Sequence, residues 1–85
     1  MNIELTYQAE DDIAYWNRTD PAKTKRINLL LRNIMQTPYS GLGKPEPLKY
    51  AFTGCWSRRI TDEHRLVYKV EGDTLYVVSC RYHYR

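Results

Sequence analysis

The chain has 85 residues, which is enough for one small domain and too few for two. Hydrophobic residues make up 42% and charged residues 27%, a balance typical of a folded globular protein and not of a disordered one. The apolar runs are far too short to span a bilayer, and the N-terminus lacks the basic start and apolar core of a signal peptide. We therefore expect a single cytoplasmic domain over residues 1–85 that has no membrane partner.

Charge is distributed unevenly along the chain, although the net value is only +3. Residues 1–20 carry five acids and one base, residues 21–43 carry four bases and no acid, and residues 44–85 carry eight bases and five acids. A basic centre and C-terminal half favour a polyanionic partner. An ordinary solvated basic surface would give the same counts, so charge alone does not decide between the two.

The N-terminal segment predicts a strand followed by a helix. Apolar and polar residues alternate from Ile3 through Leu5 to Tyr7, as in a half-buried strand. Thr6 is a candidate cap for a helix whose apolar seam contains Ile13 and Trp16.

A second helix is predicted between two proline signals. Asp20-Pro21 combines a capping side chain with proline at the first helical position, and Thr37-Pro38 ends the helix. Between them, apolar residues recur at helical spacing and mark a buried stripe: Ile27, Leu30, Leu31 and Ile34.

The rest of the chain predicts a loop and then strands. Residues 38–47 contain two glycines and three prolines, so we expect a stiff loop with no regular structure, of a length that is often functional. From Leu48 onward the pattern favours strands near 54–60 and 65–70, a hairpin turn at 71–74, and an apolar strand at 75–78 covered on both faces. The order β-α-α-β-β-β predicts an α+β fold, with two N-terminal helices packed on a mostly antiparallel sheet.

The register of the central hairpin can be predicted from parity. Cross-strand partners share a face, and pairing Trp56 with Tyr68 turns both toward the helices. Arg59 then lies opposite Arg65 on the other face. Like charges in opposed positions are unfavourable, so we interpret this pair as an anion site. Arg58 should point inward and support the structure.

Parity does not place the C-terminal histidine, His83. A two-residue turn at Gly72-Asp73 would put it on the opposite face from Arg65, and a turn of odd length would put it beside that arginine. The chain end also has the option of leaving the sheet before this residue.

Several residues together suit the cleavage of RNA, whose 2′-hydroxyl is a built-in nucleophile. Glu46, held between two prolines, is a candidate general base, and His83 a candidate general acid. Arg59 and Arg65 are candidates for gripping the phosphate, with Lys49 as a further phosphate contact. Each has a structural alternative: a solvated glutamate or lysine, arginines paired with neighbouring acids, and a terminal histidine without a task.

No metal or cofactor is expected for this chemistry. Cys55 and Cys80 match no metal-binding spacing and are interpreted as packed thiols. His64 and His83 are too few and too far apart in the sequence to indicate a zinc site. Tyr84 is a candidate for stacking on a base or orienting a phosphate.

Three segments together resemble the YoeB (Txe) toxins of the RelE/ParE toxin superfamily: 43–49 (GKPEPLK), 56–68 (WSRRITDEHRLVY) and 80–84 (CRYHY). The resemblance implies a microbial-RNase-like fold and a ribosome-dependent mRNA endonuclease, the toxin of a type II toxin–antitoxin pair, that cuts mRNA in the ribosomal A site. The family's general base, transition-state arginine and general acid match Glu46, Arg65 and His83. Its supporting substrate contacts match Lys49, Arg59 and Tyr84.

The resemblance also implies partners: a homodimer, and an antitoxin whose disordered acidic C-terminal segment covers the active site. Two alternatives are kept. One is a non-catalytic toxin of the same superfamily that binds DNA gyrase, and the other is a plain nucleic-acid-binding module. Neither requires an acid–base pair, whereas this chain contains both Glu46 and His83.

Overall fold

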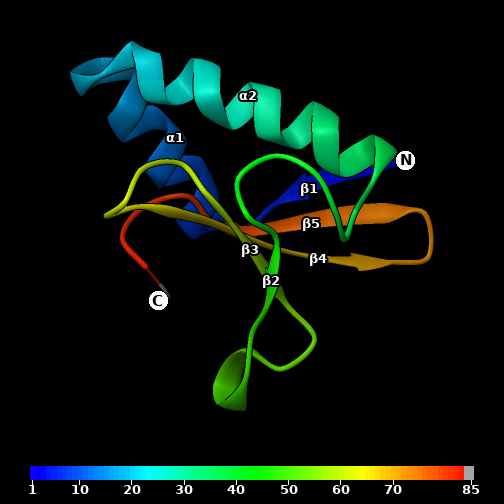
Figure 1. The fold of residues 1–85 in the computed structure, drawn as a ribbon. Coiled ribbons are helices and arrows are strands. Elements are labelled where there is room, and N and C mark those ends of the chain that lie inside the picture. The colour runs from blue at the N-terminus through cyan, green and yellow to red at the C-terminus, as the bar shows by residue number, and fades with distance from the viewer. Residues whose placement is uncertain (84–85) are drawn as a thin grey trace.

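The computed structural model describes residues 1–83. Two helices pack on one side of a five-stranded sheet of order β1-β5-β4-β3-β2, in which β1 runs parallel to β5 and the other neighbours are antiparallel (Figure 1). This confirms the predicted α+β fold. No helix in residues 1–83 is long and apolar enough to cross a membrane. The elements in chain order are β1 (Asn2–Leu5), α1 (Tyr7–Thr19), α2 (Pro21–Gln36), β2 (Glu46–Pro47), a 3₁₀ turn (Tyr50–Phe52), β3 (Trp56–Arg59), β4 (Arg65–Glu71) and β5 (Thr74–Ser79).

The two helices begin where the sequence predicts, but by different means. Thr6 Oγ1 accepts a hydrogen bond from the Ala9 N–H at 3.0 Å, which confirms the predicted cap of α1. Pro21 is the first residue of α2, as expected. The predicted side-chain cap is wrong, however, because the Asp20 carboxylate makes no capping hydrogen bond and instead pairs with Lys23 at 2.6 Å. A full charge one turn into the helix competes successfully with the backbone N–H groups.

The core lies between α2 and the central strands. The four predicted stripe residues of α2 are all buried, and they share one apolar cluster with Leu66, Tyr68, Leu75 and Val77. The apolar run of β5 is covered less completely than expected. Leu75 and Val77 are fully buried, but Tyr76 and Val78 are only half-buried. The expectation of cover on both faces is therefore wrong, because both helices lie on the same side of the sheet.

Two local assignments in the middle of the chain also need correction. Glu46 and Pro47 are not irregular but form β2, which pairs with Ser57 and Trp56 at the edge of the sheet. Proline is tolerated there because an edge strand does not need every backbone donor. Residues 50–52, expected within a β pattern, instead form the 3₁₀ turn of a lobe that projects away from the helices (Figure 1).

The loop before β2 is anchored against α2 and the end of β3. Gly43 has φ +80° and its carbonyl accepts the Arg59 N–H at 2.7 Å. A Cβ at this position would lie 2.9 Å from Leu30 Cδ2 and 3.2 Å from Arg58 Cβ, so the loop approaches as closely as only glycine allows. This contact fixes the chain three residues before Glu46.

Candidate active site

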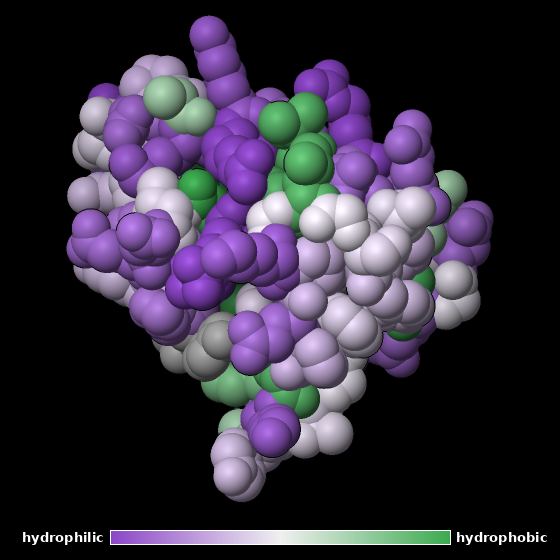
Figure 2. Space-filling view, in the orientation of Figure 1, coloured by the Kyte–Doolittle hydropathy of each residue, from purple (hydrophilic) through white to green (hydrophobic). Residues whose placement is uncertain are grey.

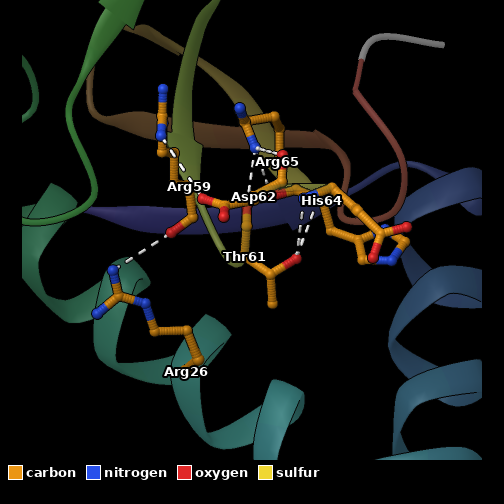
Figure 3. Close-up of polar contacts among 7 residues, drawn as sticks. Arg26, Arg59, Thr61, Asp62, His64 and Arg65 are labelled. Atoms are coloured by element: carbon orange, nitrogen blue, oxygen red, sulfur yellow. Dashed lines mark hydrogen bonds and ion pairs between the residues drawn. The ribbon is translucent and has the colours of Figure 1, made fainter.

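The central hairpin has the predicted register. Trp56 pairs with Tyr68, and Arg59 pairs with Arg65. The two arginine side chains extend to the same side of the strands, away from α2 (Figure 3). Because Glu46 pairs with Ser57, two residues before Arg59, its position in β2 belongs to this same face. Three strands therefore bring Glu46, Arg59 and Arg65 to one face of the sheet.

Arg65 is buried, with 8% of its surface exposed. Its Nη1 donates to three carbonyl oxygens of the preceding turn, those of Thr61 at 2.7 Å, Asp62 at 2.9 Å and His64 at 3.3 Å. These bonds aim the guanidinium but leave Nε and Nη2 without an acceptor in the described residues. Arg65 also forms no ion pair within residues 1–83. Nε and Nη2 are not among the buried unpartnered atoms of the described residues, so they reach solvent. A fixed arginine with two donors open to solvent is suited to binding a phosphate.

Arg59 is more exposed and loosely paired. Its Nη1 lies 3.7 Å from Asp62 Oδ1, and the Asp62 side chain is fully exposed. An ion pair of this length in solvent is worth little. Its carbonyl oxygen accepts a bond from Arg26 Nη2 at 3.3 Å, which ties the end of β3 to α2 (Figure 3). An anion that binds Arg59 more tightly than Asp62 does can therefore displace this ion pair.

Glu46 and Lys49 lie on the rim of a pocket of about 480 Å³ that is formed by residues 46–52. Both are exposed. The lobe that carries the pocket is held by short-range backbone bonds, including Leu48 N–H to the Cys55 carbonyl at 2.9 Å and Phe52 N–H to the Lys49 carbonyl at 3.1 Å. The predicted base and the predicted lysine contact thus border one concave surface.

The tail leaves the sheet before His83, which was one of the three alternatives. Glu71 pairs with Thr74, so the hairpin turn has two residues, and a bulge between β4 and β5 then shifts the register near Val67. β5 ends at Ser79. The chain turns back toward Arg65, whose backbone N–H donates to the Tyr82 carbonyl at 2.7 Å.

His83, the next residue after Tyr82, is exposed. The structure therefore brings His83 to the end of the sheet that carries Arg65. Tyr84 lies outside the described residues. Figure 2 shows hydrophilic side chains gathered over this end of the molecule, where the β3–β4 turn and the tail meet.

Arg58 confirms the expectation of an inward, structural arginine. It is fully buried and donates to Tyr68 Oη, Asn33 Oδ1 and three loop carbonyls, those of Thr37, Ser40 and Leu42. Cys80 is also buried, as expected of a packed thiol, and Cys55 is half-buried. Burial raises the pKa of the Cys55 thiol, an effect that nearby Lys69 opposes.

Two residues that support the site were not identified from the sequence. Asp12 is buried and its Oδ2 accepts the Cys80 N–H at 2.8 Å. Its place on the Trp16 side of the helix was the available signal. His64 accepts the Tyr82 N–H on Nδ1 at 2.8 Å. Its position beside Arg65 was visible, but its partner is 18 residues away and left no local pattern.

The chain also matches a known protein family. A family model described as "YoeB-like toxin of bacterial type II toxin-antitoxin system" matches residues 5–84. Toxin YoeB of Escherichia coli K12 is 50% identical over 84 residues, which cover 99% of this chain and 100% of that protein.

Solved structures give the same result. A YoeB/ParE toxin from Agrobacterium tumefaciens has a TM-score of 0.96 at 51% identity, with 99% of this chain and 100% of that one covered. A YoeB–YefM complex and a YoeB dimer, both from Staphylococcus aureus, have TM-scores of 0.91 and 0.92 at 44% and 45% identity, each covering 99% of this chain and 98% of the other. The chain therefore belongs to the family of YoeB-like toxins of bacterial type II toxin–antitoxin systems.

Proposed function

We propose that this chain is a ribosome-dependent endonuclease that cuts mRNA in the ribosomal A site and so inhibits translation. The proposal rests on the surroundings of the Arg65 side chain. The residue as a whole is buried, its guanidinium is aimed by three carbonyl groups, and it has no carboxylate partner in the described residues, while Arg59 stands directly opposite. The phosphodiester of a bound RNA supplies the missing negative charge.

The reaction follows from the types of side chain at this face. The Glu46 carboxylate removes the proton from the 2′-hydroxyl, and the 2′-oxygen attacks the adjacent phosphorus. Negative charge grows on the non-bridging oxygens, where Arg65 stabilises it with Arg59 and Lys49. The bond from phosphorus to the 5′-oxygen breaks as His83 donates a proton to that oxygen. The products are a 2′,3′-cyclic phosphate and a 5′-hydroxyl. Glu46 has gained the proton of the 2′-hydroxyl, and His83 has given one to the 5′-oxygen.

The proposed partners follow the relatives. A YoeB–YefM complex and a YoeB dimer exist for the Staphylococcus aureus toxin. We infer that this chain likewise forms a homodimer and is silenced by a cognate antitoxin. An acidic, disordered C-terminal segment of that antitoxin would place carboxylates against Arg59 and Arg65, in competition with RNA.

The test is cleavage in a translating extract, with 5′-end mapping of the transcripts. Glu46→Gln and His83→Ala should each reduce single-turnover cleavage by roughly 10²-fold or more while ribosome binding persists, because each removes one proton-transfer step. Glu10→Gln, an exposed carboxylate on α1, is the matched control and should cleave normally. Unchanged cleavage by His83→Ala would eliminate the acid role, and intact transcripts together with gyrase inhibition would support the non-catalytic alternative.

A further inference from the structure

Two hydrogen bonds hold the backbone of Tyr82, one at its N–H and one at its carbonyl. Its N–H donates to Nδ1 of His64 at 2.8 Å, and its carbonyl accepts the backbone N–H of Arg65 at 2.7 Å. His64, the last residue of the β3–β4 turn, and Arg65, the first residue of β4, thus hold one residue of the tail. Tyr82 has φ +60°, in the left-handed region that a tyrosine rarely adopts without outside support. The residue held in this way directly precedes His83.

The His64 ring is itself fixed by packing. Its centroid lies 4.8 Å from that of Trp16, edge-on at 76°, and 5.7 Å from that of Tyr82. Trp16 is buried, and its Nε1–H donates to the Cys80 carbonyl at 2.8 Å. Trp16 therefore fixes both the orientation of the His64 ring and the position of Cys80, where the tail begins. Asp12 adds a second anchor there by accepting the Cys80 N–H at 2.8 Å.

The hydrogen bond defines the protonation state of His64. A ring nitrogen that accepts from a backbone N–H carries no proton, so the imidazole is neutral with its proton on Nε2. Burial lowers the pKa of His64 from its ordinary value of 6.5, and Lys23, Arg81 and His83 lower it further against the opposing charge of Glu63. Held neutral in this way, His64 is suited to accept a hydrogen bond and poorly suited to supply a proton.

We propose that His64 is a positioning residue, whose Nδ1 holds the Tyr82 peptide in its left-handed conformation and thereby places His83 at the phosphate beside Arg65. This inference rests on the proposed function, in which His83 is the general acid. In this proposal Arg65 has two roles. Its side chain binds the phosphate, and its backbone N–H helps to position the general acid, His83.

Two variants of His64 separate the hydrogen bond from the ring. In His64→Asn, Oδ1 stands the same number of bonds from Cβ as Nδ1 and can accept the Tyr82 N–H, but the side chain cannot donate an acid proton. In His64→Phe the ring still packs against Trp16 but has no acceptor. Positioning predicts that His64→Asn keeps single-turnover cleavage within threefold of the wild type, whereas His64→Phe loses at least tenfold with ribosome binding unchanged.

A structural measurement accompanies the rates. Amide hydrogen exchange at Tyr82, followed by NMR on the full chain, should become at least tenfold faster in His64→Phe and stay near the wild-type rate in His64→Asn. The pH–rate profile of His64→Phe should have a lower plateau and unmoved inflections, because the acid is misplaced and not replaced. If His64→Phe acted only by disturbing the fold, there would be no reason for His64→Asn to keep both the wild-type cleavage rate and the wild-type exchange rate at Tyr82.

The outcomes separate the two proposals. Wild-type cleavage by His64→Phe, with His83→Ala inactive, would overturn the positioning role and leave the proposed function intact. Loss of cleavage in His64→Asn with Tyr82 exchange unchanged would also overturn it, in favour of proton transfer by His64 itself. Normal cleavage by His83→Ala would instead reject the proposed acid, and with it the need to position that residue.

Discussion

Two buried arginines on neighbouring strands, one on each face of the sheet, have opposite surroundings. Arg58 on β3 points toward the helices and donates to five acceptors, three of them carbonyls of the loop that leads to Glu46. Arg65 on β4 points to the other face, and its side-chain bonds to residues 1–83 all leave from Nη1. Both are less than 9% exposed, so burial alone does not distinguish them.

The difference shows how a small domain separates support from chemistry. The donors of Arg58 are satisfied within the protein, which closes the loop onto α2 and gives the site its frame. Within residues 1–83 the donors of Arg65 are aimed but not saturated, which is the arrangement that the proposed phosphate contact requires. An arginine with a full set of protein acceptors indicates a structural role, and a buried arginine with unused donors indicates a binding site.

Replacing Arg58 should have the largest effect, and on stability. Arg58→Met fills a similar volume but removes five hydrogen bonds from a charged donor, each typically worth roughly 1.5–3 kcal/mol. The Leu42 carbonyl loses its donor, whereas Asn33 Oδ1 keeps the Leu42 N–H and the Ser40 carbonyl keeps the Thr37 hydroxyl. We expect the free energy of unfolding in urea to fall by roughly 3 kcal/mol or more. Arg32→Met, on the exposed side of α2, is the control and should change it by about 0.5 kcal/mol or less. Equal losses in both variants would contradict the assigned role.

Replacing Arg65 should affect cleavage and spare the fold. Arg65→Ala removes the aimed guanidinium, and single-turnover cleavage should fall by about 10²-fold or more, the usual scale for one donor that stabilises transition-state charge. Arg65→Lys keeps a charge but loses the planar fork, so it should recover only part of the rate. The free energy of unfolding should fall far less than in Arg58→Met. A loss of cleavage below threefold would reject the phosphate role.

A smaller effect is expected at Gly43, in the loop before β2. Gly43→Ala places a Cβ at φ +80° against Leu30 and Arg58, and should reduce the free energy of unfolding by about 1–2 kcal/mol through backbone strain and crowding. Gly72→Ala is a matched control, because its φ is also positive at +58° but nothing lies within 4 Å of the added Cβ. If both variants lose the same stability, the close approach to Arg58 contributes nothing.

The smallest expected effect is a pH dependence at His64. Its pKa is lowered in the folded state, mainly by burial, so the unfolded chain binds the proton more readily. Stability is therefore fully present above the ordinary value of 6.5 and is lost as pH falls from there through the lowered folded pKa. Urea unfolding of the wild type and His64→Asn at pH 7.5 and pH 5 measures this. The wild type should lose more stability than the variant, and parallel losses would contradict the expectation.

Local patterns in the sequence determined the two helices and the pairing of the central hairpin. The α2 stripe, the Thr6 cap and the positions of Pro21 and Thr37 follow from helical spacing and terminal signals, which act over a few residues. The opposition of Arg59 and Arg65 followed from parity, because side chains alternate strictly along a strand. Glu46 and both arginines could be assigned to a common site from these rules and a family resemblance.

Only the tertiary structure decided the path of the tail and the surroundings of each cation. One extra residue in the bulge near Val67 changes the parity of everything after it, so no counting rule could place His83. The bonds from Tyr82 to His64 and from Cys80 to Asp12 join residues 18 and 68 positions apart. Such contacts depend on how helix and sheet pack together. Packing between distant segments produces no repeating pattern in the sequence from which these contacts could be predicted.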